Sequence, residues 1–158
     1  MSDSPLQALE KHPFAAEFSA AHQARLASMV KEVHFAPNQV IFHEGDDYSV
    51  LYLLVEGMVA LELEVPDHVL RVQTLYGGDV FDWSALLRHA GKHFQARALD
   101  SVTALAIEGE DLLASFDSDP KFGLDFMLRL MGVVSECLRA TRLQLLDMYS
   151  PVAKRAGA

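Results

Sequence analysis

The stretch with the clearest chemical potential is residues 77–87, which read GGDVFDWSALL. A Gly-Gly turn leads into a short apolar run, and Asp82, Trp83 and Ser84 then open a predicted helical turn over 83–88. Amide groups at a helix start bind anions, because several N–H donors converge there and the helix dipole favours negative charge. The stretch therefore predicts an anion site, unless the side chains of Asp82 and Trp83 close it.

Histidines are the other residues that could do chemistry, and the chain has seven of them. None forms an HxH or HExxH spacing, which a metal site on one strand or helix needs. The nearest approach to a cupin-like metal set is His34 and His43, expected on neighbouring strands, together with Glu44. Histidines that line the barrel or face solvent are favoured over a metal site. A jelly-roll metalloenzyme is the weakest alternative.

No arrangement in the chain predicts catalysis. Neither a Ser/His/Asp set nor a pair of carboxylates occurs at a recognisable spacing, so no catalytic residue is assigned and the chain is not expected to be an enzyme. The acidic stretches EGDD and EGED are typical of solvated turns and of a helix start.

Length and charge narrow the possible functions further. The chain has 158 residues, 51% of them hydrophobic and 22% charged, as expected for one globular domain. Its net charge of −9 argues against direct binding to DNA or RNA, which needs clustered Lys and Arg. No secretion signal or apolar run of membrane-spanning length is present. One cysteine excludes an internal disulfide, and a cytoplasmic location without membrane contact is expected.

The elements that position the Gly-Gly stretch begin with helices and continue as strands. Ser4 and Ser19 are predicted caps, the first of a helix over 5–11 and the second within a helical segment over 14–30. From residue 30 to 107 the hydrophobic period changes to two, and Gly, Pro, Asn and Asp break the chain into seven or eight short runs. This spacing predicts an antiparallel β-roll, that is, a jelly-roll barrel.

The last third of the chain is predicted to be helical. A short helix over 108–119 precedes Asp119, a candidate N-cap, and Pro120. The next helix covers residues 121–149, about 43 Å at 1.5 Å per residue, and is expected to end at Ser150-Pro151. Apolar residues repeat in heptads along it, with one polar member. This predicted dimer seam consists of Leu124, Met127, Met131, Val134, Leu138, Thr141, Leu145 and Met148. A homodimer is favoured over a helix that lies only on its own domain.

This order of elements resembles the cyclic nucleotide-binding domain family, the sensor half of catabolite-activator-type regulators. The segments that carry the likeness are HPFAAEFSAAHQARLASM, NQVIFHEGDDYSVLYLLVEGMVAL, GGDVFDWSALL and KHFQARALDSVTALAI, followed by the long helix. The likeness covers residues 12–149. It implies one domain over 1–158, with N-terminal helices at 12–30, a β-roll at 30–107, C-terminal helices at 108–149 and a tail at 150–158.

The resemblance makes GGDVFDWSALL the counterpart of the family's phosphate-binding cassette. In that cassette a Gly approaches the ligand, a Glu binds the ribose, and an Arg pairs with the phosphate. Those positions fall here on Asp82, Trp83 and Lys92. An Asp82 carboxylate could cap the helix and occupy its amides, and Trp83 could stack on a purine or plug the pocket. The candidate ligand-binding residues are Asp82, Trp83, Ser84, Ala85, Lys92 and His93.

The resemblance implies a non-catalytic regulatory sensor that binds a small ligand in the β-roll and relays it through the C-terminal helices. In this hypothesis the amides of Ser84 and Ala85, with Lys92, contact the anion, and Arg97 faces outward or forms an ion pair. Cyclic AMP or cyclic GMP is the candidate ligand, and a different small molecule is the other option. The alternative is a ligand-free dimeric interaction module with a degenerate pocket and an unknown protein partner. Only SPVAKRAGA follows the long helix, so no helix-turn-helix domain is expected.

Overall fold

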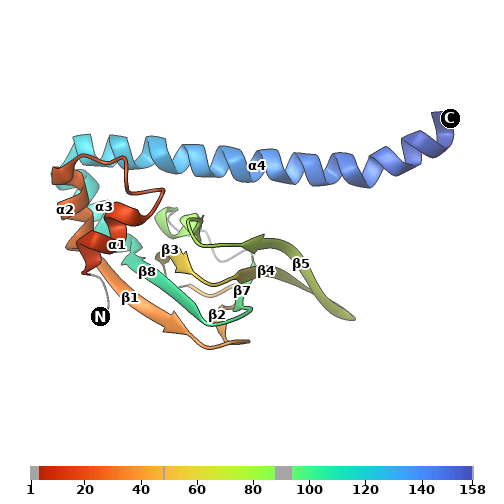
Figure 1. Cartoon of the computed structure of the whole chain (residues 1–158), viewed down its shortest axis with the longest axis horizontal. Helices are drawn as coiled ribbons and strands as arrows, with labels where there is room; N and C mark the ends of the chain where they lie inside the picture. The colour runs from red at the N-terminus through yellow and green to blue at the C-terminus, as the bar shows by residue number, and fades with distance from the viewer. Residues whose placement is uncertain (1–3, 48, 88–93, 158) are drawn as a thin grey trace. The chain divides into compact units, whose positions relative to one another are not determined.

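A computed structural model of the chain describes residues 4–47, 49–87 and 94–157, with side chains up to Tyr149 (Figure 1). The chain divides into two compact units, residues 1–123 and 124–158, which are described separately. Within the described residues, no helix combines the length and the apolar character that a membrane crossing requires.

Two helices open the first unit. Helix α1 (Pro5–Lys11) begins at Ser4, which forms a capping box with Gln7, and α2 (Ala20–Ala27) begins at Ser19 as predicted. The helical prediction over 14–30 is wrong for residues 14–18, which form turns and a bend, and for residues 28–30, which form a turn and the start of a strand. The turns at 14–18 are held by a side chain of the next helix, because Gln23 donates to the carbonyls of residues 15 and 16 at 3.0 and 3.1 Å.

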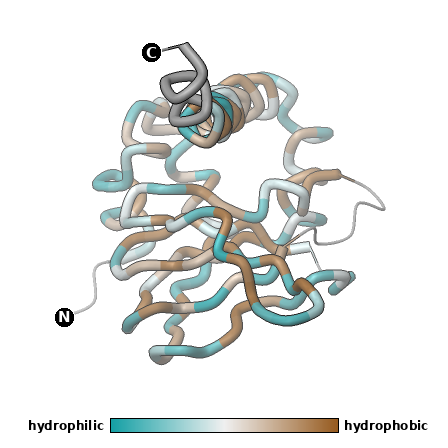
Figure 2. Tube along the Cα trace, turned by 90° about the vertical axis from the view of Figure 1, so that its right-hand side faces the viewer, coloured by the Kyte–Doolittle hydropathy of each residue, from teal (hydrophilic) through white to brown (hydrophobic). Residues whose placement is uncertain are grey.

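In the described ranges, eight antiparallel strands form two four-stranded sheets, which confirms the predicted β-roll. One sheet has the order β1-β8-β3-β6 and the other β2-β7-β4-β5. The strands are β1 (Val30–Phe35), β2 (Val40–Phe42), β3 (Val50–Glu56), β4 (Val59–Val65), β5 (His68–Leu75), β6 (Val80–Phe81), β7 (Gln95–Ala98) and β8 (Val102–Glu108). Hydrophobic and hydrophilic residues alternate along several of them (Figure 2), because successive side chains point to opposite faces of a sheet.

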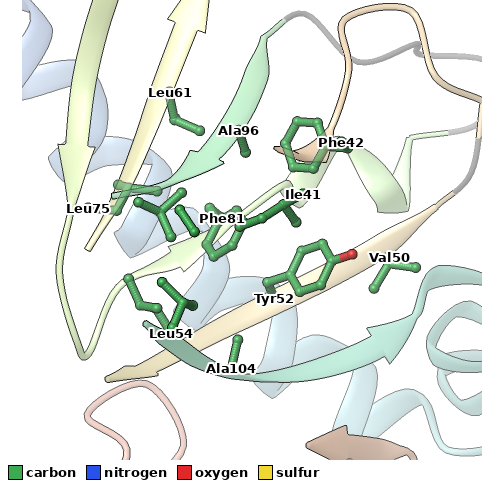
Figure 3. Packing of buried hydrophobic residues seen from close by; sticks show 13 residues of the cluster. Ile41, Phe42, Val50, Tyr52, Leu54, Leu61, Leu75, Phe81, Ala96 and Ala104 are labelled. Atoms are coloured by element: carbon green, nitrogen blue, oxygen red, sulfur yellow. The ribbon is translucent and has the colours of Figure 1, made fainter. Parts of the chain in front are cut away.

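The space between the sheets is filled by a hydrophobic core rich in aromatic rings (Figure 3). Phe81, which is fully buried, stacks on Tyr52 at a centroid distance of 5.0 Å and on Phe42 at 6.4 Å. Ala96 and Ala98 of β7 face the same core. The two small side chains leave room opposite the larger aromatic rings. Strand β6 is therefore fixed by its own Phe81, immediately before the residues of the candidate site.

The first unit ends with helix α3 (Gly109–Ser118) and the first turn of α4 (Pro120–Gly157). Asp119 accepts a hydrogen bond from the amide of Phe122 at 3.3 Å, as expected of an N-cap. The Phe122 ring lies 5.3 Å from the ring of His22 and 5.8 Å from that of Phe116. These contacts tie the start of α4 to α2 and α3 within the first unit.

The second unit is the remainder of α4. The structure contradicts the predicted end at Ser150-Pro151, because the helix continues to Gly157. A proline removes one backbone hydrogen bond and bends a helix without necessarily ending it. Figure 1 shows such a bend near the C-terminal end of α4. In the predicted seam, Val134 is half-buried and the other seven residues are exposed, with Met131 at 67% and Leu138 at 48%.

Candidate ligand-binding site

The candidate site begins at the Gly-Gly turn between β5 and β6, and both glycines are required there. A Cβ on Gly77 would lie 2.6 Å from the carbonyl oxygen of Val55, and Gly78 has a φ of +99°, a conformation that favours glycine. The Gly78 amide donates to the carbonyl of Leu54 at 2.8 Å, and the Leu54 amide donates to that of Asp79 at 2.8 Å. The turn is therefore held against the end of β3.

A buried histidine from the N-terminal segment reaches the same strand. The Phe14 amide donates to Nδ1 of His12 at 3.2 Å, so the proton of the neutral ring lies on Nε2, which donates to the Leu54 carbonyl at 2.9 Å. Burial lowers the pKa of His12, and the bond to Leu54 and the charge of Asp79 oppose this shift. His12 and Gly78 therefore share one acceptor.

After β6 the chain turns at Asp82, which has φ +65° and ψ 38°. Few residues other than glycine adopt this left-handed conformation, and Asp is one that tolerates it. The expectation that the Asp82 carboxylate caps the following helix is wrong, since its side chain makes no capping bond. Its Oδ1 instead accepts from the Ser84 hydroxyl at 3.1 Å. With this left-handed backbone the carboxylate binds a hydroxyl and does not bind the amides at the start of the following helix.

The predicted helical turn is a 3₁₀-helix, η1 (Trp83–Leu86). Its tight geometry engages the Ala85 amide, which donates to the Asp82 carbonyl at 3.1 Å. Of the two amides expected to contact an anion, only that of Ser84 has no acceptor among the described residues. Trp83 is half-buried. Of the two backbone amides expected to donate to an anion at this turn, one therefore remains.

Four of the six candidate residues lie together on one short segment, Asp82 to Ala85. Lys92 and His93 lie outside the described residues, so the expected positive charge of the site stays a prediction. The next described strand is β7, which begins at Gln95 and turns Ala96 toward the core between the sheets.

Helix η1 has a close contact that the sequence did not indicate. A Cβ added to Gly109, the first residue of α3, would lie 2.6 Å from the carbonyl oxygen of Ala85 and 3.2 Å from the side chain of Ser49. The Gly109 amide also donates to the Ser49 carbonyl at 2.8 Å. The only signal in the sequence is a glycine between a strand and a helix. The absence of a side chain at Gly109 allows α3 to begin directly on η1.

Polar residues of the sheet β2-β7-β4-β5 form a second cluster. Arg97 donates from Nε to the Glu62 carboxylate at 3.1 Å and from Nη1 to the Asn38 carbonyl at 3.0 Å. The Gln95 side chain donates to the same Glu62 oxygen at 3.1 Å. Arg97 was expected to face outward or to form an ion pair, and the ion pair is confirmed. Arg97 and Ala96 point to opposite faces of the sheet, so this cluster faces away from the core.

The histidines proposed as metal ligands are apart. His34 lies on β1, which pairs with β8, whereas His43 follows β2, which pairs with β7. The expectation that they occupy neighbouring strands is therefore wrong. His34 contacts Glu32 at 3.0 Å, and His43 lies 3.8 Å from Asp46. Within the part of the chain that the structure describes, no group of three or more His, Cys, Asp or Glu side chains could hold a metal ion.

The comparison with known families agrees with this architecture. Residues 32–119, more than half of the chain, match the model of the cyclic nucleotide-binding domain. The chain belongs to the cyclic nucleotide-binding domain family. In this cyclic nucleotide-binding domain the matched region runs from β1 to the end of α3, and it includes the Gly-Gly turn, η1 and the residues 88–93 that the structure does not describe.

Individual proteins show the same likeness. A structure from Geobacter metallireducens GS-15, named "Putative Cyclic nucleotide-binding protein", is 26% identical with a TM-score of 0.76, covering 87% of this chain and 99% of the other. The catabolite activator protein of Thermus thermophilus is 24% identical with a TM-score of 0.69, covering 87% and 63%. A Rhodopseudomonas palustris "Putative potassium channel protein" is 24% identical over 108 residues, 68% of this chain. The chain spans about a quarter of the length of that curated relative.

Proposed function

We propose that the chain is a non-catalytic regulatory sensor that binds a small ligand of the nucleotide class in its β-roll, at the segment Asp82–Ala85. The observation that carries this proposal is the packing of Gly109 directly on the Ala85 carbonyl. A ligand that displaces η1 therefore moves the start of α3. Such coupling needs a ligand that binds one arrangement of η1 better than another.

The path from η1 to the C-terminal helices runs through the first unit. Helix α3 begins on η1 and ends at Ser118, one residue before the N-cap of α4. Phe122 in the first turn of α4 contacts the rings of Phe116 and Phe18. Because these rings are packed against one another, a shift of α3 displaces the beginning of α4. This supports a relay from the ligand to the long helix.

The alternative is a dimeric interaction module that has lost its ligand, and Asp82 is the observation that favours it. Its carboxylate stands immediately before η1, where the family places a glycine, and a second anion there would be repelled. Trp83 stands where the family places the ribose-binding Glu. The choice between the two functions depends on whether Asp82 and Trp83 reject a cyclic nucleotide.

Calorimetry and thermal unfolding with cyclic AMP and cyclic GMP distinguish the two functions. Ligand at a hundredfold excess over its dissociation constant should stabilise the fold by about 2.7 kcal/mol. Lys92→Gln should weaken this effect without changing the stability of the free protein, because Lys92 supplies the expected positive charge. If neither nucleotide stabilises the protein at millimolar concentration, the nucleotide sensor is refuted.

A gain-of-function variant makes a negative result informative. Asp82→Gly with Trp83→Glu restores the family residues, and glycine adopts the φ of +65° without strain. Binding by this double variant and not by the natural chain would establish the degenerate pocket. Binding by neither would refute a nucleotide pocket of either kind.

We further propose that the chain forms a homodimer through the heptad seam of α4. The support is a repeat of large apolar side chains that are exposed in the described chain, among them Leu124 at 63%, Met131 at 67% and Met148 at 73%. Apolar side chains at heptad spacing are buried when two helices pair. Burial of each such side chain contributes about 1.5–3 kcal/mol.

Sedimentation tests the dimer with two matched substitutions on one helix. Leu138→Asp places a charge in the seam and should give a monomer. Leu143→Asp is the control, because Leu143 is equally exposed, at 47%, and lies outside the seam. A natural chain that already sediments as a monomer, or equal effects of both substitutions, would contradict this dimer.

A further inference from the structure

An open cleft of about 340 Å³ lies between α2 and α3, within the first unit, and no residue of η1 lines it. Its wall on α3 consists of residues at helical spacing, which present one face, and its other wall is the end of α2 and the two residues after it. The lining residues are Arg25, Ser28, Met29, Asp111, Ala114, Ser115 and Ser118. Three serines, two apolar residues and one residue of each charge thus line the same space, and each serine hydroxyl donates to a carbonyl three residues earlier.

Arg25 is incompletely hydrogen-bonded at one end of this cleft. Its Nη2 donates to the Ser118 hydroxyl and, at 3.5 Å, to the Ser115 carbonyl near the C-terminal end of α3. Its Nε is buried and has no hydrogen-bond partner among the described residues. A buried donor without an acceptor costs free energy, because folding removes its hydrogen bond to water and supplies no other. A carboxylate that accepts from Nε and Nη2, once the guanidinium turns toward the cleft, would remove this cost.

Asp111 limits which anion the cleft accepts. It lies on α3 one turn before Ser115 and two turns before Ser118, or roughly 6 to 10 Å from the region that Arg25 contacts. A phosphate would be repelled by this carboxylate, whereas a cationic group on the ligand would be attracted. Met29 and Ala114 offer apolar surface in the same cleft. The arrangement fits a molecule with a carboxylate and a cation at its two ends.

We propose that the cleft binds a small zwitterion, with its carboxylate on Arg25, its ammonium group near Asp111 and an aliphatic spacer over Met29 and Ala114. The ligand class is an ω-amino carboxylate, and the site is independent of the nucleotide pocket. Binding withdraws the Arg25 guanidinium from Ser118 and Ser115, so it loosens the end of α3 just before α4. The cleft is thus a second input to the joint between these helices.

The test uses 6-aminohexanoate as the probe and the natural chain labelled with ¹³C at its methionine methyl groups. The Met29 signal should shift in a saturable way, because Met29 lines the cleft. Hexanoate lacks the ammonium group and hexylamine lacks the carboxylate, so each should shift the signal at least tenfold more weakly at equal concentration. Glycine, whose charges are too close together, should not shift it.

Variants test the roles of the two charged residues. Arg25→Gln and Asp111→Asn should each weaken the Met29 response to 6-aminohexanoate at least tenfold. In Asp111→Asn, 6-aminohexanoate and hexanoate should shift the Met29 signal equally. Arg71→Gln is the matched control, since Arg71 is exposed on β5 outside the cleft, and it should leave the response unchanged. If Arg25→Gln impairs folding, the exposed Asp111→Asn still decides. An unchanged Met29 signal in the natural chain, or equal responses in Asp111→Asn and natural protein, would overturn the proposal.

Discussion

Replacing Gly109 by alanine tests the contact between η1 and α3 most directly. The new Cβ would lie 2.6 Å from the Ala85 carbonyl oxygen, so the two backbones must separate by about 0.8 Å to reach an ordinary contact of 3.4 Å. Both contacting groups belong to the packed interior, since Ala85 is 5% exposed. Overpacking of this kind costs about 1–3 kcal/mol. We expect Gly109→Ala to lower the free energy of unfolding by that amount.

Urea unfolding measures the loss of stability, and tryptophan fluorescence measures the displacement of η1. Trp83 is the only tryptophan in the chain and lies on η1, so its emission reports on that helix alone. Gly109→Ala should change this emission in the folded protein. Gly132→Ala is the matched control, because Gly132 is also helical but has no atom within 4 Å of an added Cβ. Because alanine has a higher helix propensity than glycine, Gly132→Ala should raise the free energy of unfolding by up to about 1 kcal/mol.

One result would refute the reasoning. If Gly109→Ala is as stable as the natural chain and leaves the Trp83 emission unchanged, then the contact between α3 and η1 is not tight. The proposed relay from the ligand site to α3 would then lose the observation that carries it.

Three further predictions concern single residues elsewhere in the fold. Phe81→Ala should lower the free energy of unfolding in urea by about 3–5 kcal/mol, because it empties the centre of the core, and a loss below 1 kcal/mol would contradict that packing. Burial lowers the pKa of His12 below its unfolded value of about 6.5, so the unfolded state binds a proton more readily than the folded state. The free energy of unfolding should therefore be highest above that pH and decrease as the pH falls toward the lowered pKa. His12→Gln can still donate to Leu54, and it should reduce the fall of the urea midpoint with decreasing pH. His43→Gln, at an exposed site, is the control and should leave that fall unchanged. The same pH dependence in the natural chain and both variants would contradict the role of His12. Asp119→Ala should cost about 0.5–2 kcal/mol in the same assay, and no change would show that the cap is unimportant.

The parts of the fold that the sequence predicted are those set by local patterns. Alternating apolar residues and turn-forming residues define the strands, and the caps at Ser4 and Ser19 depend on residues within one helical turn. Residues 14–18 could not be predicted, because their turns depend on hydrogen bonds between the side chains of Gln23 and His12 and the backbone, which a hydrophobic period does not display. The continuation of α4 through Pro151 was missed for a different reason, since one missing hydrogen bond does not outweigh the bonds on either side.

The candidate site was predicted in position but not in chemistry. The Gly-Gly turn and a short helix at 83 are readable from residue types alone. That the Asp82 side chain meets a hydroxyl and not an amide depends on a left-handed backbone, which sequence does not display. The contact of Gly109 with Ala85 and the cleft at Arg25 each join segments far apart in the chain, so no local pattern indicates them.

The left-handed conformation at Asp82 has an evolutionary consequence. The backbone there still has the shape that suits a glycine, although the side chain has changed. A codon for aspartate becomes one for glycine by a single base substitution, and the fold would accept that substitution without rearranging the chain. A return to glycine would therefore remove the carboxylate that stands before η1 and leave the β-roll unchanged.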